Sequence, residues 1–410
     1  HESTFKQQNT PRYHARDVGL VRAQRTGAVV VLGSATPALE SWKNAQDGRS
    51  TLLSLTRRVA GRRLPEVRIV DLKDPDERLR RRSRLSRTLE VRMQEALRAG
   101  GQIILLQNRR GYATSVACPR CGYVVECEHC DVALTYHKSD RIAMCHLCGH
   151  EKRVPPACPD CAFTDLSYQG VGTQTIEEEL ATRFPDARVA RMDSDTMATR
   201  SSYEDVLDRF GRREIDILIG PQLIAKGLDF PHVTLVGIVS ADTALMLPDF
   251  RASERTFGLV AQVAGRAGRG DEDGRVVVQT RLPNNPAIGF AAEQDYAAFA
   301  ERELAEREGF GYPPYSRLLR VVVRGPDEAA VRRRIGETRD RVVAAADPET
   351  EILGPAVPPV ARTQGQFRRH LLVKAPDHVR IRRVLDALRA APRPRGQVEE
   401  VWDVDPAGVV

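Results

Sequence analysis

The chain has 410 residues, with 62 lysines and arginines against 55 acidic residues, a formal net charge of +7. This length suits several domains with ample core, and no apolar run approaches the roughly 18 residues that a membrane-spanning helix needs. The chain starts on a polar stretch without the pattern of a signal peptide, so we expect an intracellular, cytoplasmic protein. The modest positive excess is compatible with a polyanionic partner.

Apolar runs predict the first regular elements. Residues 28–37 indicate a buried strand that ends in a loop of small residues. Helical periodicity follows over residues 89–99, and residues 102–107 form a second apolar strand.

All eight cysteines come next, as four Cys-x-x-Cys pairs: Cys118/Cys121, Cys127/Cys130, Cys145/Cys148 and Cys158/Cys161. Two thiolates at this spacing can bind one metal ion, and two pairs complete a tetrahedral zinc shell. Paired cysteines in an intracellular protein favour metal over disulfides, which remain the alternative. We therefore expect two zinc ions, and their closed, all-thiolate shells make them structural.

The four pairs can be combined in three ways. Joining neighbours would link the first two pairs across only five residues, 122–126, which is tight. A nested arrangement joins the two inner pairs across residues 131–144, as in a zinc ribbon, and lets the outer pairs close around them. We favour the nested arrangement over the interleaved one. Nearby histidines that could replace a cysteine are His129, His137, His146 and His150.

Strand and helix patterns alternate after the cysteines. Helical patterns cover 176–184, 202–210 and 252–264, and extended patterns cover 187–192, 215–220, 233–239 and 276–280. Such alternation predicts a parallel sheet with crossover helices, an α/β class of fold. Loops at the carboxyl ends of such strands bind ligands.

The tail has a different pattern, which begins after a connector that follows the Leu282–Pro286 boundary. Extended patterns cover 318–323, 357–362, 368–374 and 398–404, and helical ones cover 327–346 and 378–391. This β-α-β-β-α-β order is that of the split, ferredoxin-like arrangement, so we expect a small α+β domain.

Three short motifs carry the chemistry, one at the end of a predicted helix and two after predicted strands. Gln262-Val-Ala-Gly265-Arg266-Ala-Gly268-Arg269 places two arginines three residues apart, so that both can neutralise one phosphate cluster, and its glycines allow close backbone approach. Lys226-Gly227 comes about forty residues earlier, and Ser34-Ala-Thr36-Pro lies far upstream. In this order the motifs resemble the late motifs of superfamily 2 helicases.

The resemblance becomes specific with the cysteines and further markers. These include Lys6-Gln7, Arg12–Asp17, Asn108–Tyr112, Asp249-Phe250-Arg251, Tyr312-Pro313-Pro314 and Asp403–Pro406. Together they resemble the PriA family of replication restart helicases over essentially the whole chain. The family also pairs the cysteines in the nested way. The resemblance implies an ATP-driven 3′-to-5′ DNA helicase that recognises stalled or branched forks and initiates primosome assembly.

The resemblance also implies roles for individual residues. Gln262, Arg266 and Arg269 would act on the ATP phosphates, with Gly227, Gly265 and Gly268 beside the nucleotide. Candidate contacts to branched or single-stranded DNA are Ser34, Thr36, Lys226, Arg12, Tyr13, Arg16, Arg368 and Arg369. Primosome proteins and single-strand-binding protein are the implied protein partners, and ATP and Mg²⁺ the implied cofactors of the complete protein.

Two parts of the family pattern are missing from the chain. His1 matches the last residue of an Asp-Glu-Glu-His box whose acidic residues are absent, and no Gly-x-x-x-x-Gly-Lys-[Ser/Thr] phosphate loop occurs. We therefore expect the carboxyl-terminal portion of a longer helicase, inactive as an ATPase alone. The alternative is a zinc-containing primosome scaffold that binds DNA without unwinding it. A RecQ-type helicase is disfavoured, because the cysteines lie inside the second lobe.

We expect three domains. Residues 1–55 would be a remnant of the first RecA-like lobe, and residues 56–282 the second lobe, with the zinc-binding module inserted at 115–165. Residues 283–410 would be a connector and a domain that binds DNA or a partner. The module's basic and aromatic side chains suggest that it too contacts DNA or a partner.

Overall fold

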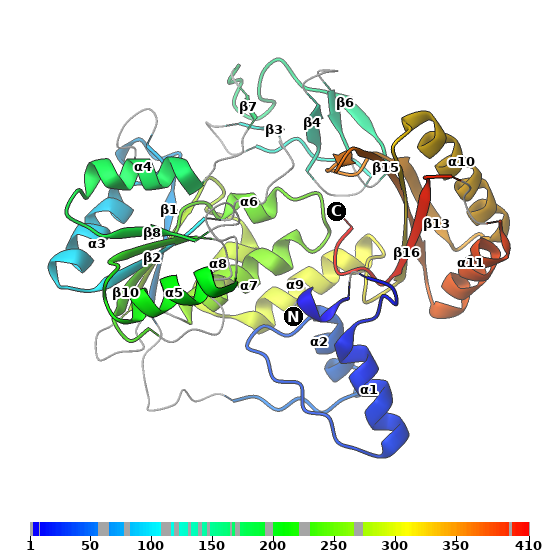
Figure 1. Cartoon of the computed structure of the whole chain (residues 1–410), viewed down its shortest axis with the longest axis horizontal. Coiled ribbons are helices and arrows are strands. Elements are labelled where there is room, and N and C mark those ends of the chain that lie inside the picture. Colours follow the sequence, from blue (N-terminus) through cyan, green and yellow to red (C-terminus); the bar gives the residue numbers. More distant parts are fainter. Residues whose placement is uncertain are drawn as a thin grey trace.

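The computed structural model describes the chain in a series of ranges. It leaves out residues 1–2, 8, 56–64, 78–82, 108–115, 119–122, 130–132, 138–141, 146–147, 165, 169–172, 193–199, 221–229, 266–273, 393–395 and 410. The described residues form a parallel-sheet lobe, a module above it, an antiparallel-sheet domain and an amino-terminal segment (Figure 1). None of the described helices is both long and apolar enough to cross a membrane.

The lobe is built on a six-stranded sheet in which every pair of neighbours is parallel. Its strands, in spatial order, are β1 (Glu66–Asp71), β11 (Arg275–Thr280), β10 (Val233–Ile238), β2 (Gln102–Leu106), β9 (Ile217–Gly220) and β8 (Val189–Arg191). Strands β2 and β9 are buried along their whole length, as expected for the centre of a sheet with both faces covered. The predicted α/β class is therefore confirmed.

Helices cover both faces of this sheet. Ile103 and Leu105 of β2 pack with α3 (Arg87–Arg98) and α4 (Thr173–Arg183). Ile104 and Leu106 point to the other face, towards α5 (Arg200–Gly211), α7 (Ala252–Ala264) and α8 (Pro286–Glu293). This alternation along one strand divides the core into two layers. The short helix α6 (Asp242–Leu245) precedes α7, and α9 (Tyr296–Gly309) follows α8.

The cysteine-containing module is an insertion between β2 and α4. Its first and last strands, β3 (Val116–Ala117) and β7 (Ser167–Tyr168), pair antiparallel. Between them lies a three-stranded sheet of β4 (Thr135–His137), β5 (Ile142–Met144) and β6 (Glu151–Arg153). The two ends of the insertion therefore meet, and the module projects from one place on the lobe (Figure 1).

The carboxyl-terminal domain has the predicted β-α-β-β-α-β order. Its sheet runs β13 (Glu351–Ala356), β15 (Gln366–Ala375), β12 (Arg317–Gly325) and β16 (Glu399–Val404), all antiparallel, and β14 (Arg362–Thr363) makes a short pair with β15. Helices α10 (Glu328–Ala345) and α11 (His378–Ala390) cover one face. This is the ferredoxin-like arrangement.

One strand of this domain was predicted in the wrong place. The main partner of β15 is β13, not residues 357–362, of which only Arg362 lies in a strand. Pro358 and Pro359 have no N–H to donate to a ladder, which rules out a regular strand there. Pro355 is tolerated in β13 because β13 lies at the edge of the sheet.

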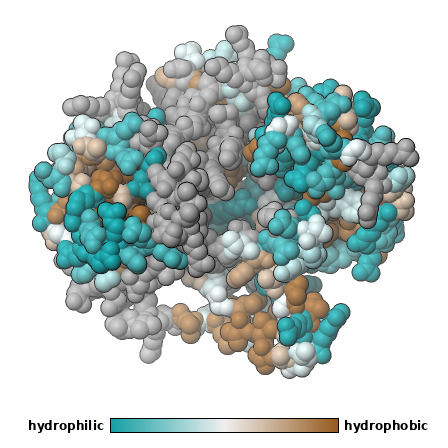
Figure 2. Space-filling view, viewed as in Figure 1, coloured by the Kyte–Doolittle hydropathy of each residue, from teal (hydrophilic) through white to brown (hydrophobic). Residues whose placement is uncertain are grey.

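The amino-terminal segment contains α1 (Ala15–Thr26) and α2 (Leu39–Gln46). The buried strand predicted at 28–37 is wrong, because the segment is extended but belongs to no strand, and Val29 and Val31 are 90% and 84% exposed. A strand needs a hydrogen-bonded neighbour, and none of the described strands lies beside it. Val18 and Leu32 of the same segment are also exposed apolar residues. Figure 2 shows a brown, hydrophobic area at the bottom of the molecule, where Figure 1 places the amino-terminal segment.

Candidate metal centre and nucleic-acid interface

Two groups of three cysteines each bring their sulfur atoms within 4.8 Å of one another. One group is Cys118, Cys158 and Cys161, and the other is Cys127, Cys145 and Cys148. This is the nested arrangement. The fourth cysteine of each expected site, Cys121 and Cys130, lies outside the described residues.

The sulfur distances fit a metal site. Cys118 Sγ lies 3.6 Å from Cys161 Sγ, and Cys127 Sγ lies 3.7 Å from Cys148 Sγ. Both distances greatly exceed the roughly 2.05 Å of a disulfide bond. A Zn–S bond of about 2.3 Å places tetrahedral ligands about 3.8 Å apart, close to these values. The donor set, sulfur only and mostly buried, is one that zinc prefers.

Two turns with the same hydrogen bonds position the second cysteine pair of each group. The Cys145 N–H donates to His150 O and the Gly149 N–H to Cys145 O, at 2.8 and 3.0 Å. Cys158 and Ala162 repeat this pattern at 2.8 and 2.9 Å. The residue after each pair takes the left-handed conformation, with φ of 81° at Gly149 and 57° at Ala162. Glycine adopts it at little cost, whereas alanine is strained there.

The base of the module packs on the rest of the molecule. Its buried Val125 and Leu134 share one apolar cluster with Phe250 of the lobe and with Leu318 and Leu372 of the carboxyl-terminal sheet. Tyr123 and Tyr136 of the module are half-buried and pack against this cluster. The module is therefore anchored to both larger parts of the molecule.

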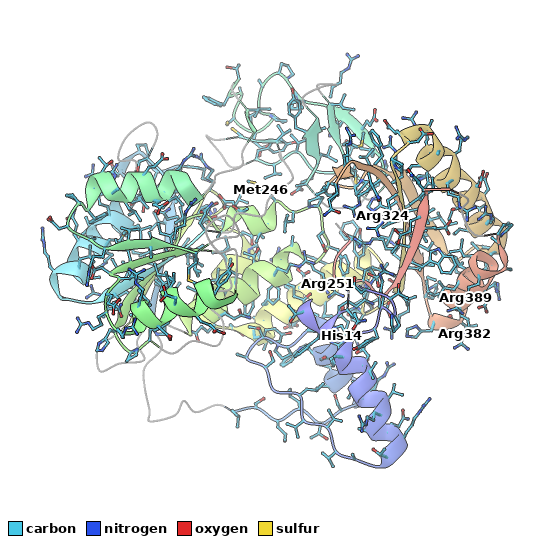
Figure 3. The ribbon with its side chains drawn as sticks, viewed as in Figure 1. His14, Met246, Arg251, Arg324, Arg382 and Arg389 are labelled. Carbon is cyan, nitrogen blue, oxygen red and sulfur yellow. The ribbon has the colours of Figure 1, made fainter. Side chains whose placement is uncertain are left out.

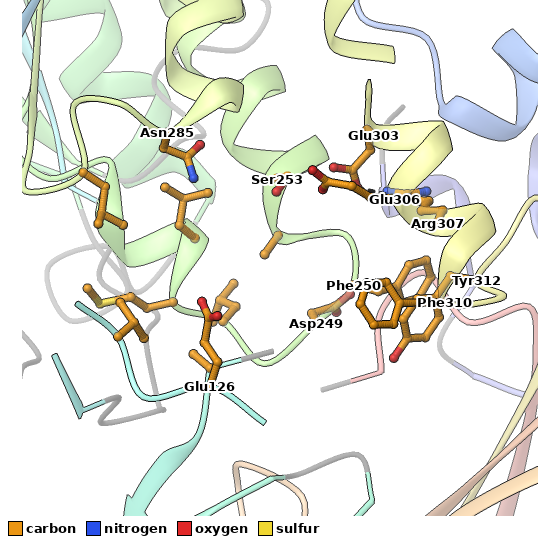
Figure 4. Close-up of a pocket in the computed structure, with 17 residues that line it drawn as sticks. Glu126, Asp249, Phe250, Ser253, Asn285, Glu303, Glu306, Arg307, Phe310 and Tyr312 are labelled. Atoms are coloured by element: carbon orange, nitrogen blue, oxygen red, sulfur yellow. Dashed lines mark hydrogen bonds and ion pairs between the residues drawn. The ribbon is translucent and has the colours of Figure 1, made fainter. Parts of the chain in front are cut away.

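Phe250 is the residue of the lobe on which this contact centres. Its ring stacks on Tyr312, with centroids 4.8 Å apart and planes at 6° (Figure 4). Beside the pair lies a pocket of about 170 Å³, which has Glu126 of the module on one side and Glu303 and Arg307 of α9 on the other (Figure 4).

The arginine motif begins on helix α7. Gln262 lies in the last turn of this helix, and Gly265 is its carboxyl-terminal cap. Arg266, Gly268 and Arg269 of the motif lie outside the described residues, as do Lys226 and Gly227 of the second motif. The roles expected for all these residues remain predictions.

The Ser-Ala-Thr motif lies just before helix α2. Ser34 is exposed, and its Oγ accepts a hydrogen bond from the Thr36 N–H at 3.1 Å. Thr36 is only 5% exposed, and among the described residues its buried hydroxyl has no hydrogen-bond partner. Ser34 is therefore the accessible hydroxyl of the motif, whereas Thr36 faces inward.

The aromatic-basic cluster near the amino terminus lies around the start of α1. Arg12 donates to Thr10 at 3.1 Å, and the Tyr13 ring is 41% exposed. Arg16 donates to Asp17 at 2.8 Å and to Ser41 of α2 at 3.2 Å. Arg16 thus links the two helices of the segment. Burial lowers the pKa of the neighbouring His14 (Figure 3), with a further contribution from Arg16.

Arg368 and Arg369 are neighbours on β15 and therefore point to opposite faces of the carboxyl-terminal sheet. Arg369 donates to Glu328 of α10 at 2.8 Å, so it belongs to the helix-covered face. Arg368 lies directly across from Arg324 of β12, on the face that the helices leave open and that the module covers in part at Leu318 and Leu372. Arg368 is half-buried there.

Like charges gather on this open face. Burial and then the nearby guanidinium groups of Arg320 and Arg324 lower the pKa of Arg368. Arg324 (Figure 3) pairs across the sheet with Glu399 of β16, at 2.7 Å between Nη2 and Oε2. Burial also lowers the pKa of Arg320, although Asp403 opposes the effect. A surface with crowded arginines would gain from a polyanion.

Three family models match separate parts of the chain. The helicase conserved C-terminal domain matches residues 167–271, the PriA DNA helicase Cys-rich region domain matches residues 127–153, and the primosomal protein N C-terminal domain matches residues 308–407. The middle match covers the inner cysteine group, which makes this a zinc-binding region.

Curated relatives match nearly the whole chain. Replication restart protein PriA of Bacillus subtilis (strain 168) is 45% identical over 374 residues, which are 91% of this chain and 46% of that protein. The protein of the same name from Treponema pallidum (strain Nichols) is 40% identical over 419 residues, 100% of this chain and 61% of that protein. The chain belongs to the PriA family.

The chain spans about half the length of the PriA relatives it matches. A solved structure of RecG bound to a three-way DNA junction aligns over 66% of this chain and 26% of that one, with 14% identity and a TM-score of 0.36. That likeness is too slight to carry an argument about this PriA family member.

Sequence reasoning missed one feature, a set of buried charges that we call the Arg251 cluster: Glu40, Arg251, Glu254, Glu303 and Arg307. Asp249-Phe250-Arg251 stood out only as a marker of the PriA family. Arg251 lies at the start of α7 and pairs with Glu40 of α2 and with Glu254 of α7, at 2.5 and 3.1 Å. Arg307 of α9 pairs with Glu254 at 2.9 Å and with Glu303 at 3.0 Å.

The charges of the Arg251 cluster balance if one carboxyl holds a proton. Burial opposes ionisation of Glu254, but Arg307 and Arg251 outweigh it and hold the pKa of Glu254 at about 2. Burial raises the pKa of Glu303 to about 7, although Arg307 opposes the rise. Among the three acidic groups that face the two guanidinium groups, Glu303 is therefore the first to take up a proton as the pH falls.

Proposed function

We propose that this chain forms the second motor lobe, zinc-binding module and carboxyl-terminal domain of an ATP-dependent 3′-to-5′ DNA helicase of replication restart. The complete protein would act in the cytoplasm, recognise stalled or branched forks and initiate primosome assembly. ATP and Mg²⁺ would be its cofactors, and primosome proteins and single-strand-binding protein its protein partners.

One observation supports this proposal most. A module with two cysteine groups is inserted between β2 and α4 of a fully parallel sheet, and the same module contacts the carboxyl-terminal domain. An isolated zinc ribbon folds without contacts to a parallel-sheet lobe or to a carboxyl-terminal domain. The combination is typical of a DNA-binding module held in a fixed position on a motor lobe.

The zinc ions would be two in number and structural. Cys118, Cys158 and Cys161 with Cys121 would hold one, and Cys127, Cys145 and Cys148 with Cys130 the other. Four thiolates leave no open position for a substrate, so these ions would stabilise the module and take no part in hydrolysis.

DNA contact would use hydroxyl groups and one arginine on two sides of the molecule. Ser34 and Tyr13 are exposed on the amino-terminal segment, and the half-buried Arg368 lies on the face of the carboxyl-terminal sheet that the helices leave open. Lys226 and the arginine motif would contribute nucleic-acid and nucleotide contacts from the lobe.

Binding of forked DNA tests the proposal. We expect the zinc-loaded chain to bind a forked duplex at low salt, with an affinity that falls steeply as salt increases, because phosphate contacts release counterions. An equally long duplex without a fork is the matched control. No measurable binding to either DNA at low salt would contradict the proposal.

The second candidate is a primosome scaffold that binds DNA without unwinding it. The 410 residues contain no Gly-x-x-x-x-Gly-Lys-[Ser/Thr] phosphate-loop motif. We propose that this stretch of sequence alone does not hydrolyse ATP. An assay of ATP turnover by the chain, with and without forked DNA, tests this. Robust DNA-stimulated turnover would refute it.

A further inference from the structure

Four contacts fix helix α2, and Pro37 just before it, to helices α7 and α9 and to Arg251. Leu39 is fully buried against Ala300 and Leu304 of α9. The Leu39 N–H donates to Glu254 Oε1 at 3.1 Å, and the residue after it, Glu40, pairs with Arg251. The Tyr296 hydroxyl donates to Pro37 O at 2.7 Å. These contacts hold the stretch that directly follows Ser34 and Thr36.

Helix α7 relates this contact to the arginine motif. Its first turn carries Glu254 and begins beside Arg251, whereas its last turn carries Gln262 and ends at Gly265. A helix of 13 residues extends about 20 Å. Its buried side chains, among them Phe257 and Val260, fix it on the sheet. One rigid element therefore bears the docking point of the Ser34 motif at one end and the arginine motif at the other.

The residues before Arg251 bind two other parts of the molecule at the same place. Asp249 Oδ2 accepts from the Val409 N–H at 3.2 Å and pairs with Arg255 at 3.0 Å, so it holds the end of the chain. Phe250 anchors the module, and the Arg251 guanidinium carbon lies 4.7 Å from the Phe250 ring centroid. Figure 3 places Arg251 at the meeting point of these parts.

Stability alone is a weak reason for so many buried charges. Apolar side chains of similar size often stabilise a protein as much as a buried ion pair does, whereas ion pairs specify geometry. Here the forked donors of Arg251 reach Glu40 and Glu254 on two different helices, which fixes α2 relative to α7.

We propose that Arg251 and Glu40 are positioning residues, which hold the Ser34–Thr36 motif against α7 so that it can contact nucleic acid. The second half of this inference rests on the proposed function. The first half, the docking of α2 through the Arg251 cluster, does not.

Trp42 reports on the docking directly. It lies on α2, with its ring centroid 5.1 Å from that of Tyr296, and it packs on the same apolar cluster as Leu39. The chain has two tryptophans, so Trp402→Phe leaves Trp42 as the single one. Quenching of its fluorescence by acrylamide then measures how well α2 is docked, with no DNA or nucleotide present.

The test compares two variants with a matched control in the zinc-loaded Trp402→Phe chain. Glu40→Gln removes one charge of the cluster. Arg251→Lys keeps the positive charge but loses the forked donors. Glu306→Gln is the control, because Glu306 makes an exposed pair with Arg302 on the same helix as Arg307. Zinc content and circular dichroism check that each variant is folded.

We expect both cluster variants to increase quenching of Trp42 roughly twofold, because local opening exposes α2. We expect them to weaken binding to forked DNA about three- to tenfold, the range for residues that act through other residues. Ser34→Ala, which removes the accessible hydroxyl of the motif, should add little to Glu40→Gln, since two changes that act on the same contact are not additive. Glu306→Gln should change neither quantity.

If acrylamide quenches Trp42 equally in both variants and in the parent, the docking of α2 through the Arg251 cluster is overturned, whatever the result for DNA binding. Greater quenching with unchanged affinity for forked DNA would overturn the positioning role, as would full additivity of Glu40→Gln with Ser34→Ala. If the parent itself fails to bind forked DNA, the proposed function fails, and with it the positioning role, whereas the docking is still decided by Trp42.

Discussion

Arg307 Nη2 and Glu254 Oε2 lie 2.9 Å apart, although the two residues belong to different helices and are 53 positions apart in the chain. Arg307 is 2% exposed and also holds Glu303. Breaking one partner out of such a pair leaves an uncompensated buried charge, which is far more costly than losing a surface pair. The Arg251 cluster should therefore dominate the pH dependence of stability in this part of the molecule.

Glu254 should make the protein less stable in acid. Its pKa is about 2 in the folded chain, below the ordinary 4.5, so its contribution is complete above pH 4.5 and is lost as the pH falls towards 2. The contribution amounts to about 3 kcal/mol of unfolding free energy at most. Urea denaturation between pH 2 and 7 should show a shallower acid loss for Glu254→Gln than for the parent. Equal slopes would contradict this.

Glu303 should have the opposite effect. Its folded pKa of about 7 lies above the ordinary 4.5, so the folded state binds the extra proton and loses stability as the pH rises from 4.5 through 7. We expect Glu303→Gln to gain about 2 kcal/mol relative to the parent between pH 5 and pH 8. Denaturation at the two pH values measures it, and Glu301→Gln, an exposed change on the same helix, should keep the pH dependence of the parent.

Each cysteine group should lose its own zinc independently. Cys118→Ser should leave one zinc ion per chain, held by the group of Cys127, Cys145 and Cys148. Cys145→Ser should also leave one, held by the group of Cys118, Cys158 and Cys161. Atomic absorption on the purified chain measures this, and His129→Ala, a change beside the inner group, should retain two. A loss of both ions on either cysteine change, with the module still folded, would indicate a shared site.

Ala162→Gly should stabilise the module. Ala162 has a φ of 57°, where a side chain costs about 1–2 kcal/mol, and glycine's greater freedom in the unfolded chain offsets part of the gain. We expect a net gain of about 0.5–1 kcal/mol in thermal or urea unfolding. Gly149→Ala, the matching position of the other turn, should lose stability, because its φ is 81°. A destabilised Ala162→Gly would show that the turn is not strained.

Arg368 and Arg369 should differ in their effects, although they are adjacent. Arg368→Ala removes a charge from the open face and should weaken binding to forked DNA at low salt, with a salt dependence shallower by about one phosphate contact. Arg369→Ala breaks the pair with Glu328 and should lower the stability of the carboxyl-terminal domain while leaving the salt dependence unchanged. If both changes weaken DNA binding equally, DNA binding does not depend on which face of the sheet carries the arginine.

Local patterns predicted the elements whose partners are close in sequence or whose periodicity is strong. Helices α3 and α7 and strand β2 lie within a few residues of the predicted ranges, and the order of the tail domain was correct. Spacing also favoured the nested cysteine groups, because the fourteen residues between the inner pairs form a hairpin of a feasible length. These features depend on short separations along the sequence and on the periodicity of apolar side chains.

The remaining features depend on contacts between distant parts of the chain. Strand β1 was not predicted, although the alternation of Glu66 and Arg68 with apolar residues is typical of a half-buried edge strand. Its neighbour β11 lies about 200 residues away in the chain, so no local pattern marks their pairing. The Arg251 cluster joins Glu40, Glu254 and Arg307, which are far apart in the chain, so no periodic sequence pattern relates them. Exposure of Val29 and Val31 could not be predicted either, since an apolar run does not show whether a neighbouring strand is present.

The meeting of β3 with β7, and of Cys118 with Cys161, has a consequence for how the lobe folds. Holding together two residues that are 43 positions apart has an entropic cost of about 3 kcal/mol. The pairing of β3 with β7 and zinc binding by the cysteines would offset that entropic cost, so the connection from β2 to α4 would close as readily as a much shorter loop. A chelator would then loosen this crossover first, and the protein should become sensitive to proteases between the two strands before its central sheet unfolds.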